Sequence, residues 1–374
     1  MSKYPTRPTY LEVNLPTLKN NLINIQEHVK PAKVMAVLKA NAYGHGVDGV
    51  APFLAPFADY IGVAIVEEAI HLRELGISKP ILVMGGSLPY QIPLFINHDL
   101  TLAVSSLELL DNAEIAASSA KKKLKVHLKI DTGMERIGVH DYESQPFLEK
   151  SLSCSHLEVE GIFSHFANSE LPDLVHAKLQ LERFSNVLFF YERHSVPPPS
   201  IRHMANSAAI LQFPESHLDM VRPGVMLYGI YPGKEVRRTI EVKPALTWHS
   251  KVAYSKITLP GRPVSYGSLW QPNAPMRIVT IPCGYADGYF RVMTNRSKAI
   301  VNGKKYQQVG RICMDQFMVN LEDDEARIGD EVILLGEAGS GESISAEDLA
   351  EWAGTNEYEV MTNISARVPR VFTS

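Results

Sequence analysis

The chain has few cysteines, and they do not form a pattern. Its 374 residues include three of them, at Cys154, Cys283 and Cys313, far apart and without a C-x-x-C pair. This excludes a disulfide framework and the common cysteine-based metal sites, so we predict no metal.

The charge of the chain is nearly balanced. Lys and Arg number 37 against 41 Asp and Glu, a net charge of -4. There is therefore no electrostatic case for binding nucleic acid or an anionic membrane.

Long apolar segments are also missing. No run reaches the roughly 20 residues that span a bilayer, and the first residues, 1–8, contain no apolar core of a secretory signal. The composition, 45% hydrophobic and 21% charged, is typical of a globular protein long enough for two domains. We therefore expect a soluble, cytoplasmic protein with no membrane partner.

The first two thirds of the chain alternate short apolar runs with helical patterns. Apolar residues between Leu15 and Val29 recur every three or four positions, which predicts an amphipathic helix. Eight runs typical of buried strands lie at 34–38, 60–64, 80–84, 100–104, 125–130, 157–165, 201–206 and 220–224. Segments of helical length separate them, which predicts a (β/α)8 barrel of the TIM type. An open doubly wound sheet is the alternative, although no G-x-G-x-x-G follows any strand.

The pattern changes after about residue 240, where short strand-like runs replace the helical periodicity. They lie at 246–254, 276–281, 299–301, 307–309 and 331–334. Asn302-Gly303 is a hairpin turn signal, and Ser345 with Asp348 forms a capping box for one short helix. We predict an α/β protein with a barrel at 10–240 and a mainly-β domain at 241–374, against which residues 1–9 pack.

Lys39 is the most informative residue of the barrel range, because it follows the apolar run 34–38 directly. A continuous apolar run is typical of a strand buried on both faces. The lysine then lies at the carboxyl end of that strand, where barrels hold their active sites. A desolvated lysine loses its proton more easily, as Schiff-base chemistry requires. A strand-end lysine that extends to solvent is the alternative, and this segment alone does not separate the two.

Other predicted strands end in polar residues too, as is typical of a barrel active site. These are Asp131 to Arg136 after the fifth strand, Ser164 and His165 after the sixth, His203 to Asn206 after the seventh, and Arg222 after the eighth. Asn206-Ser207 and Gly224 also offer small residues and backbone donors for a phosphate group. Asn206 equally suits a plain helix N-cap.

These motifs resemble those of the alanine racemase family, pyridoxal-phosphate enzymes of fold type III. The matching segments are K-A-N-A-Y-G-H-G from Lys39, D-T-G-M from Asp131, G-I-F-S-H-F-A from Gly161, A-N-S-A-A from Ala205, V-R-P-G-V-M-L-Y-G from Val221, V-S-Y-G from Val264, G-Y-A-D-G-Y from Gly284, G-R-I-C-M-D-Q from Gly310, and Y-E-V-M-T-N-I-S-A-R-V-P-R from Tyr358. They keep their order from about residue 10 to the C-terminus. One departure is Glu135, where many members have glycine or another small residue.

The resemblance implies an isomerase that interconverts L-alanine and D-alanine and supplies D-alanine for peptidoglycan. Lys39 then binds pyridoxal 5'-phosphate covalently and acts as a base on one face of the substrate, and Tyr266 acts on the other. Arg222 faces the pyridine nitrogen and joins His165 in a hydrogen-bonded chain to Tyr266, and Arg136 contacts the phenolic oxygen. The other implied positions are Tyr43, Ser207, Gly224, Val225 and Tyr358 for the phosphate, with Asn206 beside them, and Tyr285, Met314 and Asp315 with Arg136 for the substrate.

Two further expectations follow from the resemblance, and alternative functions stay open. Family members form homodimers in which the β domain of one subunit completes the other's site, so Tyr266, Tyr285, Met314 and Asp315 are expected to act in trans. Lys129 matches a lysine that is carbamylated in some members, and a plain strand lysine is an equal alternative. A racemase for serine or a basic amino acid, or a non-catalytic pyridoxal-phosphate carrier, is the alternative function. A biosynthetic or a catabolic role fits the same chemistry.

Overall fold

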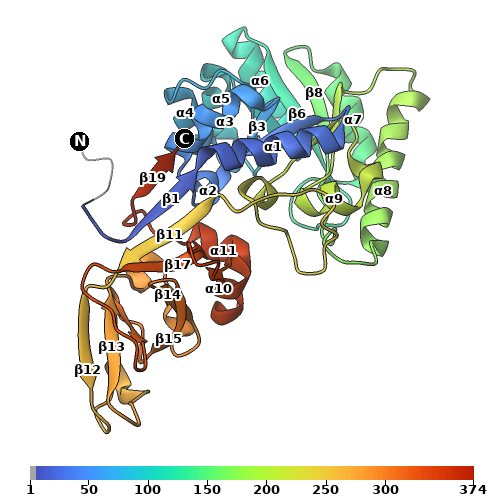
Figure 1. Ribbon diagram of the computed structural model, residues 1–374. Coiled ribbons are helices and arrows are strands. Elements are labelled where there is room, and N and C mark those ends of the chain that lie inside the picture. Colours follow the sequence, from blue (N-terminus) through green and yellow to red (C-terminus); the bar gives the residue numbers. More distant parts are fainter. Residues whose placement is uncertain (1–5) are drawn as a thin grey trace. The chain divides into compact units, whose positions relative to one another are not determined.

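The computed structural model describes residues 6–374, and the chain divides into two compact units (Figure 1). One unit contains residues 18–42 and 47–243. The other contains residues 6–17, Tyr43–Gly46 and Pro244–Ser374. Within the described part of the chain, no helix is both long enough and apolar enough to cross a membrane.

The first unit is built on a closed ring of parallel strands. Its members are β2 (Lys33–Val37), β3 (Tyr60–Val63), β4 (Ile81–Val83), β5 (Thr101–Val104), β6 (Leu124–Asp131), β8 (Leu157–Phe163), β9 (Ile201–His203) and β10 (Met220–Val221). Each pairs with the next in parallel, β5 pairs with β6, and β10 returns to β2. The predicted eight-stranded barrel is confirmed, and the open doubly wound sheet is wrong.

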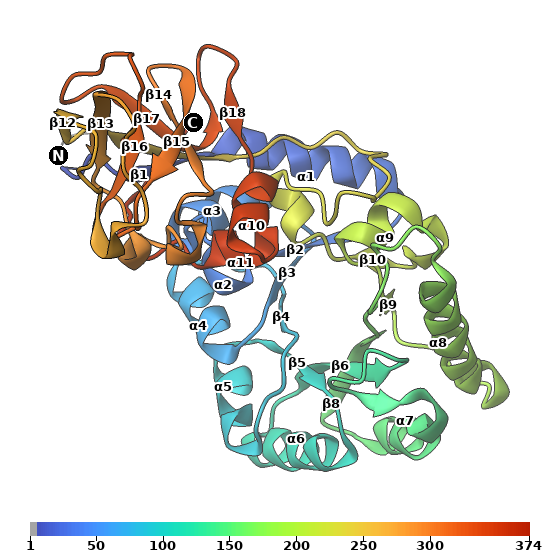
Figure 2. The ribbon, with the colours of Figure 1, turned by 90° about the horizontal axis from the view of Figure 1, so that it is seen from below.

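The helices of this unit follow the strands. They are α1 (Leu15–Val29), which begins in the other unit, α3 (Val47–Leu54), α4 (Val66–Glu74), α5 (Ile92–Asn97), α6 (Leu107–Ala120), α7 (Ser144–Ser153), α8 (Val175–Arg193) and α9 (Ser207–Gln212). Figure 2 shows α4 to α8 on the outside of the ring of strands. In α1 the predicted apolar face is confirmed, because Leu18, Leu22 and Ile25 are fully buried. Burial of such faces supplies the main stabilising term.

The barrel interior is filled by side chains from several strands. A buried cluster contains Met35, Tyr60, Leu82, Ala103, Phe163, Ile201 and Met220. In β3 and β5 every residue is buried, which explains why these strands have continuous apolar runs rather than alternating ones. A short strand β7 (Val139–His140) pairs with β6 after the loop that follows it.

The second unit is built on one long sheet that is almost entirely antiparallel. Its strands are β1 (Tyr10–Asn14), β11 (Leu246–Lys251), β12 (Tyr254–Thr258), β13 (Met276–Ile281), β14 (Lys298–Val301), β15 (Lys304–Val309), β16 (Phe317–Asn320), β17 (Glu331–Glu337), β18 (Ser343–Ile344) and β19 (Arg370–Thr373). The order is β12-β13-β16-β15-β14-β17-β11-β1-β19, with β18 on β17. Only the β1–β19 pair is parallel among these described strands. The predicted mainly-β second domain is confirmed.

The hairpin turn and the capping box predicted for this part of the sequence are both present in the structure. Asn302 and Gly303 have φ of 48° and 80° and join β14 to β15, with Val301 paired to Lys304. Ser345 caps α10 (Ala346–Ala353) through the predicted capping box with Asp348. A second helix, α11 (Glu357–Thr362), follows it.

The start of the chain packs in this sheet, although it precedes the barrel in sequence. β1 pairs with β11 and β19, and Thr9 donates to the carbonyl of Pro282 at 2.8 Å. Of the segment 1–9, residues 1–5 lie outside the described residues. The limits 10–240 and 241–374 stay our proposal for the two domains along the chain, whereas the packing units assign residues up to Thr17 and Tyr43–Gly46 to the sheet.

Candidate active site

Lys39 follows β2 and opens a single turn of unusual hand, α2 (Lys39–Tyr43). Ala40, Asn41 and Ala42 have φ of 54°, 55° and 53° with ψ near 50°, and Tyr43 has φ of 50°. Residues with a Cβ atom adopt this left-handed conformation at a cost of about 1–2 kcal/mol each. Strained backbone of this kind is concentrated at functional sites.

Glu68 holds this turn in place. Its carboxylate accepts from the backbone N–H of Ala40 at 2.6 Å and from that of Ala64 at 2.8 Å, and so joins the ends of β2 and β3. On the other side, Asn41 Oδ1 accepts from Val47 N–H at 2.7 Å. Sequence reasoning missed Glu68. The available signal was a glutamate three residues after Ile65, which precedes α4.

The environment of Lys39 favours its neutral amine. Burial lowers its pKa, and the cations Arg136 and Arg222 lower it further, against an opposing effect of Glu68. A neutral amine is the nucleophilic form that Schiff-base chemistry requires. Lys39 is partly buried, and its lowered pKa favours the Schiff-base interpretation over a lysine extended to solvent.

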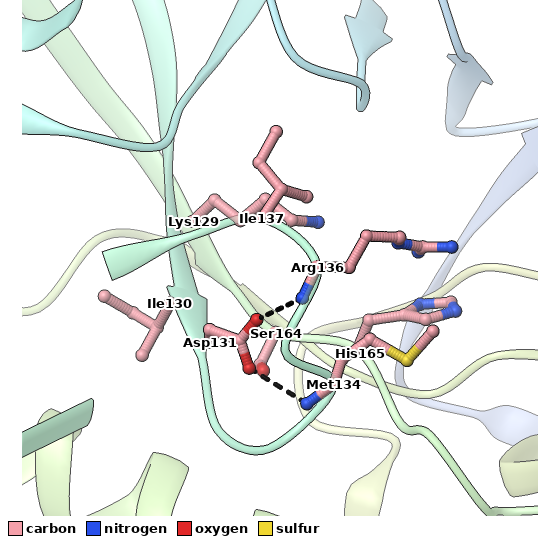
Figure 3. A pocket seen from close by; sticks show the side chains of 8 residues that line it. All are labelled: Lys129, Ile130, Asp131, Met134, Arg136, Ile137, Ser164 and His165. Atoms are coloured by element: carbon pink, nitrogen blue, oxygen red, sulfur yellow. Dashed lines mark hydrogen bonds between the residues drawn. The ribbon is translucent and has the colours of Figure 1, made fainter. Parts of the chain in front are cut away.

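Asp131 shapes the loop that carries Arg136. Its carboxylate accepts from the backbone N–H of Gly133 and Met134 at 2.9 Å, and of Glu135 and Arg136 at 3.1 Å. Burial acts to raise the pKa of Asp131, but these four donors outweigh it and lower the pKa. The loop is thereby fixed beside a narrow pocket lined by Lys129, Arg136 and His165 (Figure 3).

Glu135 in this loop has a φ of 54°. Glycine adopts that conformation without steric cost, which explains physically why a small residue suits this position. Glutamate in place of a small residue therefore adds strain to the loop. The backbone N–H groups of Glu135 and Arg136 still donate to Asp131.

Arg222 joins the ends of three strands. It is only 4% exposed. It donates to the carbonyls of Ser164 at 2.8 Å and Met204 at 3.1 Å, and to Nδ1 of His203 at 2.9 Å and of His165 at 3.1 Å. Burial lowers its pKa to about 9, so it stays a cation at neutral pH. Burial, followed by the charge of Arg222, lowers the pKa of His165 and His203, which are therefore neutral acceptors.

Lys129 lies on β6 facing the same group of cations. It is 6% exposed, and its Nζ lies 4.3 Å from the ring centroid of Phe163. Burial lowers its pKa to about 7, with Arg222 and Arg136 adding to the effect. The positive potential that disfavours an ammonium here favours an anion.

Two helix starts meet after strands β9 and β10. Asn206 caps α9, since its Oδ1 accepts from Ala209 N–H at 3.1 Å. Ser207 Oγ accepts from Gly224 N–H at 2.9 Å, and Val225 begins the short helix η5 (Val225–Tyr228). The first N–H groups of a helix have no intrahelical acceptor, so this arrangement suits an anion such as phosphate.

Tyr43 and Tyr358, two predicted phosphate positions, lie together in the second unit. Their ring centroids are 6.2 Å apart. Gly44, with φ of 81°, packs so closely that a Cβ there would lie 2.1 Å from the carbonyl oxygen of Met361. The Gly44 carbonyl also accepts from Arg370 at 3.0 and 3.1 Å. The glycine therefore permits this contact.

The other predicted residues of the second unit lie on adjoining loops. Tyr285 N–H donates to the Cys313 carbonyl at 3.1 Å, next to Met314. Asp315 accepts from Arg367 at 2.8 Å. Tyr266 follows Ser265, whose Oγ donates to the Arg311 carbonyl at 2.6 Å. Tyr266 is 71% exposed and Met314 52%, so within this unit the loops present open side chains.

The structure thus groups the predicted residues in two sets. Lys39, Lys129, Arg136, His165 and Arg222 belong to the barrel unit and affect one another's charge. Tyr266, Tyr285, Met314 and Asp315 belong to the sheet unit. A cationic pocket with two lysines of lowered pKa, Lys39 and Lys129, can bind an anionic cofactor, and the exposed Tyr266 and Tyr285 offer hydroxyl groups.

Comparison with known proteins supports this reading along the whole chain. Residues 13–232 match the family model "Alanine racemase, N-terminal domain", and residues 245–372 match "Alanine racemase, C-terminal domain". A curated alanine racemase of Carboxydothermus hydrogenoformans is 44% identical over 98% of this chain and 100% of that one.

Solved structures extend the likeness to the fold. An alanine racemase of Clostridium difficile 630 has a TM-score of 0.93 and 37% identity, covering 99% of this chain and 97% of that one. A histidine racemase of Leuconostoc mesenteroides subsp. sake has a TM-score of 0.90 and 30% identity, covering 99% of both chains. The fold alone therefore does not fix the amino acid. The two family models together span nearly all of the sequence, and the chain belongs to the alanine racemase family.

Proposed function

We propose that this racemase interconverts L-alanine and D-alanine with pyridoxal 5'-phosphate, using Lys39 and Tyr266 as bases on opposite faces of the substrate. The observation that carries the proposal is the partly buried Lys39 amine, whose pKa is lowered by burial and by the charges of Arg136 and Arg222. The full-length similarity to alanine racemases supports alanine as the substrate.

The residues present fit the proposed cofactor. Pyridoxal phosphate has an aldehyde, a phenolic oxygen, a ring nitrogen and a phosphate. Lys39 offers an amine for the first, Arg136 and Arg222 offer cationic donors for the next two, and the starts of α9 and η5 offer backbone N–H groups for the last. When bound, the group supplies an electron sink for the charge left by removal of the α-proton. Tyr43 and Tyr358 add hydroxyl groups to the phosphate set.

Arg222 sets the electronic character of the site. A guanidinium has donors only and no acceptor, so Arg222 would donate to the ring nitrogen of a bound cofactor and would leave that nitrogen unprotonated. A ring nitrogen held unprotonated withdraws electrons weakly. We infer that this favours quick return of the proton to carbon over transamination. It also argues against a decarboxylase, because the nitrogen partner there is usually acidic.

Inversion needs two bases, because one base tends to return the proton to the face it came from. Lysine and tyrosine both have reference pKa values near 10 and need help at neutral pH. Burial with Arg136 and Arg222 gives that help to Lys39. For Tyr266, we infer that His165, which accepts from Arg222 at 3.1 Å, continues a hydrogen-bonded chain to the phenol. Arg136 then orients the substrate carboxylate, and Tyr285, Met314 and Asp315 are proposed to line the substrate entrance.

A homodimer with shared sites is part of the proposal. The support is the exposure of Tyr266, Tyr285 and Met314 in their own unit, because exposed aromatic and methionine side chains gathered on adjoining loops are typical of interaction sites. The supply of D-alanine for peptidoglycan rests on the family resemblance alone, and a cytoplasmic location stays a prediction from the sequence.

The test is polarimetric. Full-length protein with pyridoxal phosphate is given L-alanine, L-serine, L-lysine or L-histidine, and circular dichroism follows each signal. We expect the alanine signal to decay to zero fastest. Decay only with another substrate would keep the two-base chemistry and change the specificity. No decay with any of the four amino acids, with cofactor still bound, would favour the alternative of a non-catalytic pyridoxal-phosphate carrier.

Loss of the bound-cofactor absorbance in Lys39→Ala checks the anchoring role in the same preparation. Lys122→Ala removes an exposed lysine of the same unit and serves as the matched control. We expect it to keep the wild-type spectrum.

A further inference from the structure

A line of polar side chains crosses the apolar interior of the barrel. It starts at Arg222 after β10 and passes through His203 on β9 and His127 on β6 to Glu160 on β8. Its surroundings include Met35, Leu82 and Phe163 of the buried core cluster. Polar groups in such an interior persist only when each is hydrogen-bonded. Nothing in the proposed function uses His127 or Glu160.

The contacts are continuous. Arg222 Nη1 lies 2.9 Å from His203 Nδ1, His203 Nε2 lies 2.9 Å from His127 Nδ1, and His127 Nε2 lies 3.4 Å from Glu160 Oε2. Tyr60 donates to the same Glu160 oxygen at 2.9 Å. Both histidines are fully buried, so water does not supply an alternative partner.

The two ends of the line dictate where every proton lies. Arg222 can only donate hydrogen bonds, so Nδ1 of His203 must be unprotonated and the proton of this ring must lie on Nε2. That proton is donated to His127 Nδ1, which must therefore be bare as well. His127 then carries its proton on Nε2 and donates it to Glu160. The ionised carboxylate of Glu160 can only accept hydrogen bonds. It therefore suits the end of a chain of hydrogen bonds that begins with Arg222, which can only donate.

The reverse arrangement is excluded by the same geometry. If His127 carried a proton on Nδ1, His203 would have to accept it at Nε2. A neutral His203 would then carry its proton on Nδ1, facing the guanidinium of Arg222. Two buried donors would oppose each other at 2.9 Å, and a buried donor without an acceptor is strongly destabilising.

A local irregularity places the carboxylate. The parallel pairing of β6 with β8 shifts between Val126 and His127, so that Val126 pairs with Val159 and His127 with Gly161. Glu160 is the extra residue of this bulge, and bulges redirect side chains. Gly161 completes the arrangement, because a Cβ there would lie 2.5 Å from His127 Nδ1.

We propose that Glu160 is a positioning residue for Arg222. Glu160 fixes His127 and His203 as neutral rings protonated on Nε2, and these rings hold the Arg222 guanidinium in its orientation. Burial lowers the pKa of both histidines. The bond from His127 lowers the pKa of Glu160, against burial, with Tyr60 and the charge of Lys125 assisting. A neutral pair of rings between an anion and a cation is consistent with these directions.

This proposal rests on the proposed function in one respect, namely that Arg222 contacts the ring nitrogen of the cofactor. The first part of its test reads proton positions in the wild type and needs neither substrate nor turnover. Full-length, cofactor-loaded protein is labelled with ¹⁵N-histidine, and the ring nitrogen shifts separate protonated from bare nitrogens. His127→Gln and His203→Gln assign the signals. In the wild type we expect both rings to be protonated on Nε2 and bare on Nδ1.

Variants separate the role of the charge from that of the fold. Glu160→Leu removes the acceptor, so we expect a mixture of protonation sites on His127 and a racemisation rate lowered about 10- to 100-fold, the range for a displaced catalytic group. Glu160→Gln keeps an acceptor oxygen and is expected to keep both proton positions. Glu158→Leu removes an exposed carboxylate of the same strand and is the matched control.

Two results would overturn the proposal. One is a wild-type protein in which either ring carries its proton on Nδ1, a result that depends on no variant. The other is a folded Glu160→Leu protein with proton positions and rate equal to those of the wild type. A protein that fails to racemise alanine but shows the expected proton positions contradicts the proposed function and leaves this inference standing.

Discussion

At the scale of single residues, one buried cation organises the site. Arg222 donates to Nδ1 of His165 and of His203, so these two ring nitrogens are unprotonated. Burial lowers the pKa of both histidines and of Lys39 and Lys129, and the charge of Arg222 lowers it further. The sequence predicted Arg222 and Lys39 because each follows a buried strand. It did not predict Glu68, because a glutamate at the start of a helix is common and its partner, Ala40, lies 28 residues away.

Lys129 gives a prediction in pH. Its pKa lies at about 7, below the reference value of about 10.4, so its neutral amine becomes dominant as the pH rises through 7. Only the neutral amine reacts with carbon dioxide. With ¹³C-bicarbonate, we expect a carbamate signal that grows between about pH 6 and pH 8. Arg136 and Arg222 attract the anion formed.

The control for this signal is Lys129→Met, which keeps the length of the side chain and lacks the amine. We expect no signal from it. An unmodified Lys129 at pH 8 in the wild type would contradict the carbamylation proposal and favour a plain buried lysine.

At the scale of elements, the left-handed turn α2 is the feature that least resembles what its sequence suggests. Ala40 and Ala42 are good formers of right-handed helix, yet both have positive φ. The turn is held by tertiary bonds from Glu68 and by the bond from Val47 to Asn41. Intrinsic propensity predicted neither the turn nor its hand, because these bonds come from residues outside the turn.

Two alanine substitutions test the hand of this turn. Ala40 is exposed with φ of 54°, so Ala40→Gly removes steric strain and is expected to raise the free energy of unfolding by about 0.5–1 kcal/mol. Ala116→Gly, in the right-handed helix α6, is expected to lower it by about 1 kcal/mol. Urea unfolding measures both. Equal destabilisation by the two changes would mean that Ala40 is not strained.

The strands show where prediction from sequence fails. The buried barrel strands were found from their apolar runs, because burial on both faces leaves a continuous signal. β12 and β19 were missed: in β12 only Thr258 is buried, and in β19 every residue is half-buried, so neither gives a clear pattern. The bulge at Glu160 was missed for another reason, since it depends on the partner strand.

At the scale of the whole molecule, the proposed bases belong to different units. Lys39 is a residue of the barrel and Tyr266 of the sheet. If the sites are shared in a two-fold dimer, each site combines one barrel with the partner's sheet. This arrangement can be tested by mixing subunits.

Lys39→Ala and Tyr266→Phe subunits are each expected to be inactive. A heterodimer of the two contains one intact site, so we expect about half of the wild-type activity. Lys39→Ala mixed with Arg222→Gln is the control, because both changes lie in the barrel unit and no intact site can form. An absence of recovery in verified heterodimers of the first kind would count against shared sites.

The most direct test of the two-base account is exchange of the α-proton in D₂O, measured by NMR for each alanine enantiomer. For Tyr266→Phe, an exposed position where loss of the hydroxyl does not disturb the core, we predict exchange of one enantiomer with its configuration retained, and almost none of the other. Exchange of both enantiomers with continued inversion at the wild-type rate would contradict the account.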